Sequence, residues 1–286
     1  MSCSERKSSV LSGSGDVVRN RLISDSKEHL MVGTHSPLLS LNNISKTFEN
    51  GTTAIDGFDL DVRAGEFLSI LGPSGCGKST ILRLISGLEE PSSGEIVRSG
   101  QGEVGFVFQE PTLLPWANTF ENVYWPLKVK GVSKRDAKDR VEEALEMVGL
   151  SSFATHMPSE LSGGMKMRVS IARALVTKPK LLLMDEPFAA LDEITRNKLN
   201  DDLLELKSTH DWTILFVTHS VYESVFLSSR IVVMAAGPGR ITHDMSLDAS
   251  YPRSLSYRME SQYAAYCREA VDALEQAIGH RIKVSA

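Results

Sequence analysis

The segment 72–80, Gly-Pro-Ser-Gly-Cys-Gly-Lys-Ser-Thr, constrains the fold of this chain more than any other feature. It matches the pattern G-x-x-x-x-G-K-[ST], whose glycines let consecutive backbone N–H groups curl around a phosphate. The short apolar run 67–71 before it predicts a strand buried on both faces, and a helical pattern follows it as far as Leu88. A strand, a glycine-rich turn and a helix in this order predict a phosphate-binding loop in an α/β domain.

The chemistry of the loop assigns expected roles to its residues. Lys78 is expected to reach the β- and γ-phosphates of a nucleotide, and the Ser79 hydroxyl to bind Mg²⁺, which prefers oxygen ligands. The N-terminus of the following helix adds partial positive charge. The side chain of Cys76 is interpreted as a bystander. The expected nucleotide contacts are Gly72, Pro73, Ser74, Gly75, Cys76, Gly77, Lys78, Ser79 and Thr80.

Two carboxylates end a second apolar strand. The run 181–184, Leu-Leu-Leu-Met, leads directly into Asp185 and Glu186, and a soluble protein seldom places charges at the end of a core strand without a use. Asp185 is expected to hold Mg²⁺, and Glu186 to accept a proton from the water that attacks the γ-phosphate. The alternative is two solvated acids, which the phosphate loop makes less attractive.

The first half of the chain shows three kinds of pattern. Residues 1–36 are rich in serine, glycine and charge, and predict a disordered N-terminal extension. Alternation at 39–48 and 55–62, with Asn50-Gly51 between, predicts an antiparallel hairpin. Residues 112–177 predict a mainly helical insertion.

The second half returns to alternating strands and helices. Apolar runs predict strands at 104–108, 180–184, 213–217 and 230–234, an order typical of α/β proteins. Residues 251–286 predict a C-terminal helical tail, with an expected apolar face of Tyr263, Tyr266, Ala270, Leu274 and Ile278.

Composition and charge exclude several function classes. The net charge of −5 gives no global positive field to hold a nucleic-acid backbone, so no nucleic-acid partner is expected. The longest apolar runs fall far short of the ~20 residues that cross a bilayer, and the polar N-terminus lacks a secretory core, which favours the cytosol. Three cysteines without metal-ligand spacing predict free thiols.

A third motif narrows the function. Ser162, Gly163 and Gly164, within Leu-Ser-Gly-Gly-Met, precede a helical pattern and so offer a hydroxyl and bare N–H groups at a second helix N-terminus. In this order with the other two motifs, the sequence from about 38 to 248 resembles the ATP-binding subunits of ABC transporters. The resemblance implies a P-loop NTPase core with an antiparallel β subdomain and a helical subdomain at about 112–177, within an ATP-binding domain at 37–250.

The resemblance also implies roles for further residues. Gln109 matches the glutamine that touches Mg²⁺ and the attacking water, and His219 matches the switch histidine that contacts the γ-phosphate. Asp192 matches the D-loop aspartate beside the partner's site. Phe48 matches the aromatic that stacks on adenine, although a strand of alternating pattern could equally turn this side chain to the core. The implied catalytic residues are thus Glu186, His219 and Gln109, with ATP and Mg²⁺ bound.

Weaker motifs at 113–116, 238–241 and 251–253 resemble the nitrate, sulfonate, taurine and bicarbonate importer branch, although Met165 stands where most of the family has glutamine. The implied partners are a second ATP-binding subunit arranged head to tail, two membrane-spanning permease subunits and a solute-binding protein. This places the chain peripherally at the cytoplasmic face of the inner membrane. Trp116 and Trp125 either receive a permease helix or fill the helical subdomain.

A soluble ABC-type ATPase of DNA repair or translation is the alternative. Such chains usually contain two domains in tandem or a long coiled coil, and neither a repeat nor a heptad pattern is visible here.

Overall fold

The computed structural model describes residues 37–99, 102–251 and 253–284, which belong to one compact unit, His35–Ala286. The expected extension at 1–36, with Cys3, lies outside the described residues. The strands are β1 (Leu39–Thr47), β2 (Thr53–Val62), β3 (Phe67–Leu71), β4 (Ser93–Arg98), β5 (Val104–Val107), β6 (Leu181–Asp185), β7 (Thr213–Thr218), β8 (Arg230–Ala235) and β9 (Arg240–Ser246). The α-helices are α1 (Lys78–Ser86), α2 (Thr119–Val129), α3 (Lys134–Met147), α4 (Gly163–Leu175), α5 (Glu193–Thr209), α6 (Val221–Leu227) and α7 (Ser261–Val284). Short 3-10 helices are η1 (Ser151–Phe153), η2 (Pro158–Glu160) and η3 (Leu255–Met259).

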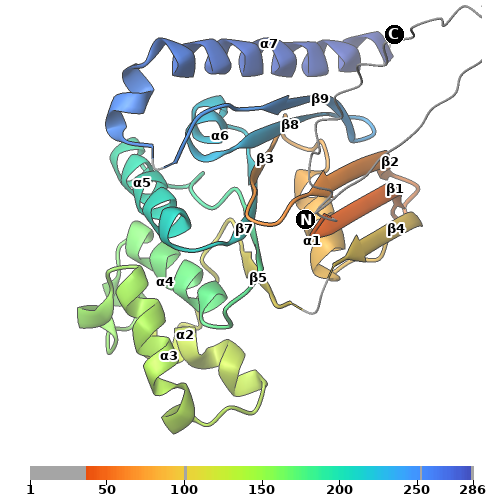
Figure 1. Cartoon of the computed structure of the whole chain (residues 1–286). Helices are drawn as coiled ribbons and strands as arrows, with labels where there is room; N and C mark the ends of the chain where they lie inside the picture. The colour runs from red at the N-terminus through yellow and green to blue at the C-terminus, as the bar shows by residue number, and fades with distance from the viewer. Residues whose placement is uncertain (1–36, 100–101, 252, 285–286) are drawn as a thin grey trace, which may run out of the picture. The chain divides into compact units, whose positions relative to one another are not determined.

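A small antiparallel sheet has the order β2-β1-β4 (Figure 1). The predicted hairpin between β1 and β2 is confirmed, and Gly51 in its turn has a φ of 81°, which glycine adopts without strain. The sequence did not reveal β4, because its side chains are largely exposed and its segment, Ser-Gly-Glu-Ile-Val-Arg, has little apolar character.

The larger sheet has the order β5-β6-β7-β3-β8-β9. Its first five strands pair in parallel, and β9 adds an antiparallel edge. The four strands predicted at 104–108, 180–184, 213–217 and 230–234 are confirmed within one residue at each end. The α/β fold class is therefore confirmed, with β9 as a further strand that sequence patterning missed.

Alternate residues of the central strands enter two separate cores. In β3, Phe67 and Leu71 join the core covered by helices α2 to α7, whereas Leu68 and Ile70 join the core beneath β1, β2 and α1. This two-residue period is expected for a strand covered on both faces. The sheet is thereby buried between two layers, and only its ends are available to form a site.

Helices α2, α3 and α4 lie in the span expected to be helical. Ser133 is the N-cap of α3, because its Oγ accepts from Asp136 N at 3.2 Å and donates to Asp136 Oδ2 at 2.7 Å. The polar side chain of Asn122, fully buried in α2, binds the preceding loop through Leu114 N at 2.7 Å and Ala117 O at 2.9 Å. This loop is therefore fixed in place before the helix starts.

Helix α7 packs against β8, β9 and α6 (Figure 1). Its predicted helical character is confirmed, but the predicted apolar face is partly wrong, because Ile278 is exposed. The buried positions are Tyr263, Cys267, Ala270, Ala273 and Ala277, which keep the 3- and 4-residue spacing with smaller side chains. Cys267, like Cys76, is a free thiol as predicted. Within the described residues, none of the helices combines the length and apolar character needed to cross a bilayer.

Candidate active site

Four neighbouring parallel strands end at one edge of the larger sheet, and each leads into a residue singled out by the sequence. Gly72 follows β3, Asp185 ends β6, His219 follows β7, and Gln109 lies two residues beyond β5. The carboxyl edge of an open parallel sheet is where such folds bind ligands. Residues distant in sequence are thus gathered at one edge by strand pairing alone.

The phosphate loop has the backbone that its glycines predict. Gly77 immediately precedes α1 with a left-handed φ of 98°, and a Cβ at this position would lie 2.5 Å from Ile55 Cδ1. Both facts exclude a larger residue there. Cys76 is only 1% exposed and packs into the core beneath β1 and β2. Its side chain is therefore part of the core, and only its backbone remains for binding.

Lys78 lies at the mouth of this loop. Its Nζ donates to Gly72 O at 2.9 Å and to Pro73 O at 3.1 Å, and it lies 3.3 Å from Glu186 Oε1. The ammonium group is buried, so its charge is poorly screened and favours an anion. The lysine of the loop and the carboxylate after β6 are thereby brought into direct contact.

Ser79 and Asp185 form a pair of oxygen ligands beside the loop. Ser79 Oγ donates to Asp185 Oδ1 at 2.8 Å. Burial raises the pKa of Asp185, an effect that the hydrogen bond from Ser79 opposes and the nearby charge of Glu186 reinforces. Because a hydroxyl and a carboxylate with a desolvated charge suit a small hard cation, these two residues fit a Mg²⁺ ion that also binds phosphates and water.

Glu186 has an unusual backbone conformation. Its φ is 44°, in the left-handed region that non-glycine residues seldom occupy, and its N–H donates to Val217 O at 2.9 Å. The side chain reaches His219, whose Nδ1 lies 2.8 Å from Glu186 Oε2. Strained backbone at the carboxyl edge of a sheet is typical of functional sites. The sequence showed the carboxylate but not this conformation.

Gln109 is at the same edge but is not engaged with it. Its side chain is exposed, and within the described part of the chain it has no hydrogen-bond partner. The segment after it is fixed from α4, because Arg173 donates to Pro111 O at 2.7 Å and to Thr112 O at 2.8 Å. Gln109 therefore lies on a tethered loop at the same sheet edge as the other site residues, but it does not contact Asp185 or Glu186.

The signature residues lie elsewhere, at the start of α4. The helix begins at Gly163, and Ser162 Oγ accepts from Met165 N at 3.3 Å. Gly164 is buried against α5, and a Cβ there would lie 2.7 Å from Thr195 Cγ2. Among the described residues, no hydrogen bond or ion pair joins Ser162, Gly163 or Gly164 to the phosphate loop.

Two further residues with predicted nucleotide contacts are Asp192 and Phe48. Asp192 caps α5 by accepting from Thr195 N at 3.0 Å. Phe48 follows β1, is half-buried, and has Lys46 Nζ 5.3 Å from its ring centroid. The ring belongs to neither core cluster. It therefore presents a face outside both cores, where a planar base could stack.

Sequence reasoning missed a buried acid behind His219. Glu223 Oε2 accepts from Thr218 Oγ1 at 2.5 Å, and Glu223 Oε1 lies 3.7 Å from Arg196 Nε. Burial raises the pKa of Glu223, while the Thr218 bond and Arg196 act in the opposite direction. The available signal was the spacing of Ser220 and Glu223, a capping-box pattern, in which Ser220 Oγ accepts from Glu223 N at 3.3 Å.

Comparison with known proteins agrees with this geometry. The sequence profile of the ABC transporter family matches residues 55–189. An aliphatic sulfonates import ATP-binding protein of Pseudomonas syringae is 47% identical over 229 residues, covering 79% of this chain and 92% of that protein. A bicarbonate transport ATP-binding protein of Synechococcus elongatus is 40% identical over 260 residues, covering 86% of this chain and 93% of that protein.

Solved structures with the same fold include ABC cassettes. The protein cbiO1 of Clostridium perfringens, described as part of the ABC transporter complex cbiONQ, has a TM-score of 0.67 at 28% identity, and the match covers 74% of this chain and 89% of that chain. An ATP-binding cassette in a dimeric post-hydrolysis state with ADP and Pi has a TM-score of 0.65 at 34% identity, covering 74% of this chain and all of its own. Together with the phosphate loop and the acidic pair, these matches show that the chain belongs to the ABC transporter family, as an ATP-binding subunit that hydrolyses ATP.

Proposed function

We propose that this chain is the energy-coupling subunit of an ABC importer, and that it hydrolyses ATP held between its phosphate loop and the signature residues of a second copy. The observation that carries the proposal is the division of the site. Lys78, Asp185, Glu186 and His219 lie together at one sheet edge, whereas the Ser162 hydroxyl lies at the start of α4 without a contact to them. A second chain, placed head to tail, supplies the missing wall.

Each residue at the sheet edge has a role in this proposal. Lys78 and the loop backbone bind the phosphates, and Phe48 stacks on the adenine. Glu186 accepts the proton of the attacking water, and His219, 2.8 Å from Glu186, orients that carboxylate and approaches the γ-phosphate. Ser79 and Asp185 would hold Mg²⁺, with Gln109 joining them on closure, and the chemistry that the ion would supply there is neutralisation of charge on the transferred phosphoryl group.

The signature residues serve the opposite site. Ser162 and Gly163 are exposed at the N-terminus of a 13-residue helix, where a hydroxyl and backbone N–H groups suit a phosphate. Asp192 lies at the start of α5, the helix against which Gly164 packs. A single rigid surface therefore carries the signature and the Asp192 loop, and both are expected to approach the partner's nucleotide together.

The permease contact is proposed for the surface around the loop before α2. Trp116 is 73% exposed and Trp125 and Phe108 are also exposed, so the alternative in which both tryptophans fill the helical layer does not hold. A shallow pocket between β5, α2 and α4 is lined by Phe108, Trp125 and Arg173. We assign this surface to a membrane-spanning permease subunit at the cytoplasmic face of the inner membrane, in a complex that contains two such permease subunits and two ATP-binding chains.

The class of solute is inferred from the relatives alone, because the solute would not touch this subunit. Their printed names concern the import of aliphatic sulfonates and the transport of bicarbonate. A small oxyanion, delivered by a solute-binding protein, is the class that these names support.

The head-to-tail arrangement is tested by ATP-dependent dimerisation. In a Glu186→Gln background, ATP should persist and hold two chains together, which light scattering detects as a doubled mass. Adding Ser162→Arg should abolish the dimer by placing a bulky charge where the partner's ATP would lie. Ser159→Arg, at an exposed serine in η2, is the matched control and should leave the dimer intact. A dimer that survives Ser162→Arg, or one that forms equally without nucleotide, would refute the arrangement.

A further inference from the structure

Helix α6 lies between the His219 turn and the last part of the chain. It has seven residues, so it is only about 10 Å long at a rise of ~1.5 Å per residue. Six of its seven side chains are buried, and the helix is therefore held as one rigid piece. A constraint on one end of so short a helix is transmitted to the other end.

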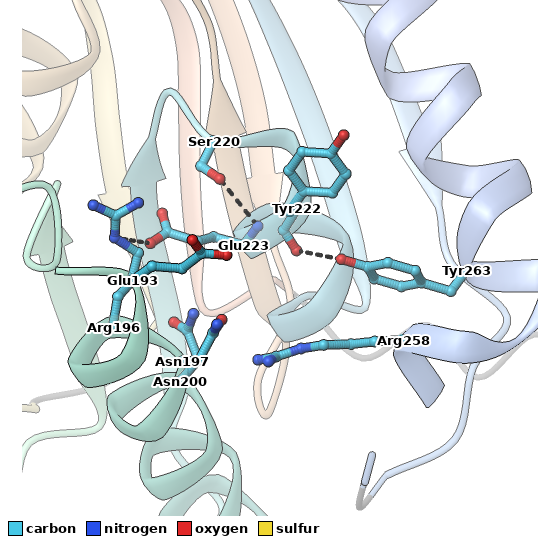
Figure 2. Close-up of a pocket in the computed structure, with 9 residues that line it drawn as sticks. All are labelled: Glu193, Arg196, Asn197, Asn200, Ser220, Tyr222, Glu223, Arg258 and Tyr263. Carbon is cyan, nitrogen blue, oxygen red and sulfur yellow. Dashed lines mark hydrogen bonds and ion pairs between the residues drawn. The ribbon is translucent and has the colours of Figure 1, made fainter. Parts of the chain in front are cut away.

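The first turn of α6 determines the backbone around His219. Thr218 Oγ1 donates to Glu223 Oε2 at 2.5 Å and accepts from Ser220 N at 3.0 Å. On the other side, Ser220 Oγ accepts from Glu223 N at 3.3 Å (Figure 2). Both neighbours of His219 are thus bonded to one residue of α6, and the imidazole between them has its Nδ1 2.8 Å from Glu186 Oε2.

The carboxyl end of α6 is capped by Arg253, from the segment that follows β9. The last four carbonyls of a helix have no partner within it. Arg253 is buried, and its Nη1 donates to two of these carbonyls, Val225 O and Phe226 O, both at 2.9 Å. A cationic donor at this end of a helix also matches the negative end of the helix dipole. One side chain, distant in sequence, therefore satisfies two carbonyls that the helix itself leaves unpaired.

Tyr251 caps the next carbonyl. Its hydroxyl donates to Leu227 O at 2.5 Å, and burial raises the pKa of Tyr251 to about 12, so the hydroxyl remains a donor at neutral pH. Cζ of Arg253 lies 4.6 Å from the Tyr251 ring centroid and 5.1 Å from that of Tyr257, within cation–π range of both. Arg253 also donates to Ala249 O at 3.1 Å, which ties it to its own segment. Tyr251 and Arg253 therefore act together on the end of α6.

We propose that Arg253 and Tyr251 are positioning residues for ATP hydrolysis. By holding the carboxyl end of α6, they fix the turn at its other end and so orient the His219 imidazole toward Glu186. Among the described residues, neither side chain has a hydrogen bond to the phosphate loop or to the acidic pair, so both act only through α6. The inference rests on the role proposed for His219, and it gives the sequence motif at 251–253 a physical function.

Two buried tyrosines beside Arg253 provide a matched pair of variants. Tyr251→Phe removes the hydroxyl that caps α6, whereas Tyr257→Phe removes a buried hydroxyl that has no hydrogen-bond partner among the described residues. Because a small misplacement of a catalytic group is costly, kcat should fall about threefold in Tyr251→Phe and about tenfold or more in Arg253→Gln. In both, the Kd of ATP should change by less than about twofold, and Tyr257→Phe should keep the wild-type kcat.

Thermal melts of each variant show that it is folded at the assay temperature, and Tyr251→Phe remains informative where Arg253→Gln does not fold. Equal losses of kcat in the two tyrosine variants overturn the proposal. So does a wild-type kcat in Tyr251→Phe and Arg253→Gln, or a loss confined to the affinity for ATP.

The orientation of His219 is read directly from its ring nitrogens. In a chain labelled with heavy nitrogen in histidine, long-range proton–nitrogen NMR spectra of the neutral imidazole show which ring nitrogen carries the proton. The signals that disappear in His219→Ala belong to this residue. The wild type and Tyr257→Phe should keep the proton on Nδ1, which faces the Glu186 carboxylate, and Tyr251→Phe and Arg253→Gln should shift it toward Nε2. Unchanged His219 signals in these two variants overturn the proposal, whatever their kcat.

The His219→Ala variant separates this inference from the role proposed for the histidine. Its kcat should fall, and adding Arg253→Gln should lower kcat by less than about twofold more, because both changes act on the same group. A further tenfold loss would show that Arg253 acts by another route and would overturn the inference. A wild-type kcat in His219→Ala would instead refute the role of His219 in hydrolysis, while the NMR signals still decide whether Arg253 and Tyr251 orient its ring.

Discussion

Glu186 joins two parts of the chain through one carboxylate, since its Oε2 lies 2.8 Å from His219 Nδ1 and its Oε1 lies 3.3 Å from Lys78 Nζ. The phosphate loop, the end of β6 and the end of β7 are thus linked at a single side chain. The Glu186 carboxylate is therefore influenced both by the charge on the nucleotide's phosphates and by the orientation of the histidine.

Replacement of this carboxylate by an amide should separate binding from turnover. Glu186→Gln keeps the size and hydrogen-bonding shape of the side chain but removes the general base, so kcat should fall by about 10²–10⁴ while ATP still binds. Phosphate release and equilibrium binding of labelled ATP measure the two effects. Glu205→Gln, at an exposed position on α5, is the control. Near-normal hydrolysis by Glu186→Gln would show that the base is another group.

The contact between α4 and α5 predicts a suppressor pair. Gly164→Ala places a Cβ 2.7 Å from Thr195 Cγ2 and should destabilise the fold by about 1–3 kcal/mol, because neither helix can move freely. Thr195→Ser removes the Cγ2 methyl and should recover most of that loss in the double variant. Urea denaturation of the wild type, both single variants and the double variant measures the coupling. Simple additivity of the two losses would contradict the proposed steric contact.

The buried carboxyl group of Asp185 should make the free energy of unfolding depend on pH. Burial raises its pKa above the ordinary value of 3.8, so the folded state holds this proton more tightly than the unfolded state. As pH rises from 3.8 through the raised folded pKa, the unfolded state ionises first and the stability contributed by this group is lost.

Asp185→Asn removes that titration while its Oδ1 can still accept from Ser79. The variant should be more stable than the wild type at neutral pH, and the advantage should vanish below pH 3.8. Urea denaturation of the wild type and the variant across this pH range measures the difference in stability. In a separate assay, the variant should have lost Mg²⁺-dependent ATP hydrolysis. A wild type that gains stability relative to the variant as pH rises would contradict the assigned burial effect.

The exposed tryptophan before α2 predicts a loss of coupling. Trp116→Glu puts a charge into the proposed permease contact, so solute uptake by cells should fall by at least about tenfold while the purified chain still hydrolyses ATP. Val129→Glu, at an apolar position on α2 that is 72% exposed, is the matched control. Uptake that is unaffected by Trp116→Glu, or equally reduced by both variants, would count against the docking surface.

Local sequence patterns predicted those structural elements that are determined by residues close to them in the sequence. The strand before Gly72 and the strand before Asp185 both depend on nearby residues, and the structure has them at the predicted places. Strands β4 and β9 were missed because each is an edge strand whose side chains are largely or partly exposed, so burial leaves no clear alternation in their sequence.

Long-range contacts account for what the sequence could not show. The sequence predicts a role for Gly164 only through its bare N–H group, and only the packing of α4 on α5 shows that Thr195 leaves no room for a larger residue there. The left-handed φ of Glu186 occurs together with a hydrogen bond from its N–H to Val217 O on the neighbouring strand, a contact distant in sequence. Ile278 fitted a helical period, but the face that α7 buries is decided by β8 and α6.

The position of β3 in the larger sheet also matters while the chain is being made. Its two neighbours, β7 and β8, both leave the ribosome only after the whole helical region has been synthesised. Until then β3 has no neighbouring strand to pair with, and pairing of this kind is slow because distant segments must meet. Nascent chains that stop short of β7 should therefore bind chaperones and fail to bind ATP, even though they already contain the complete phosphate-loop motif.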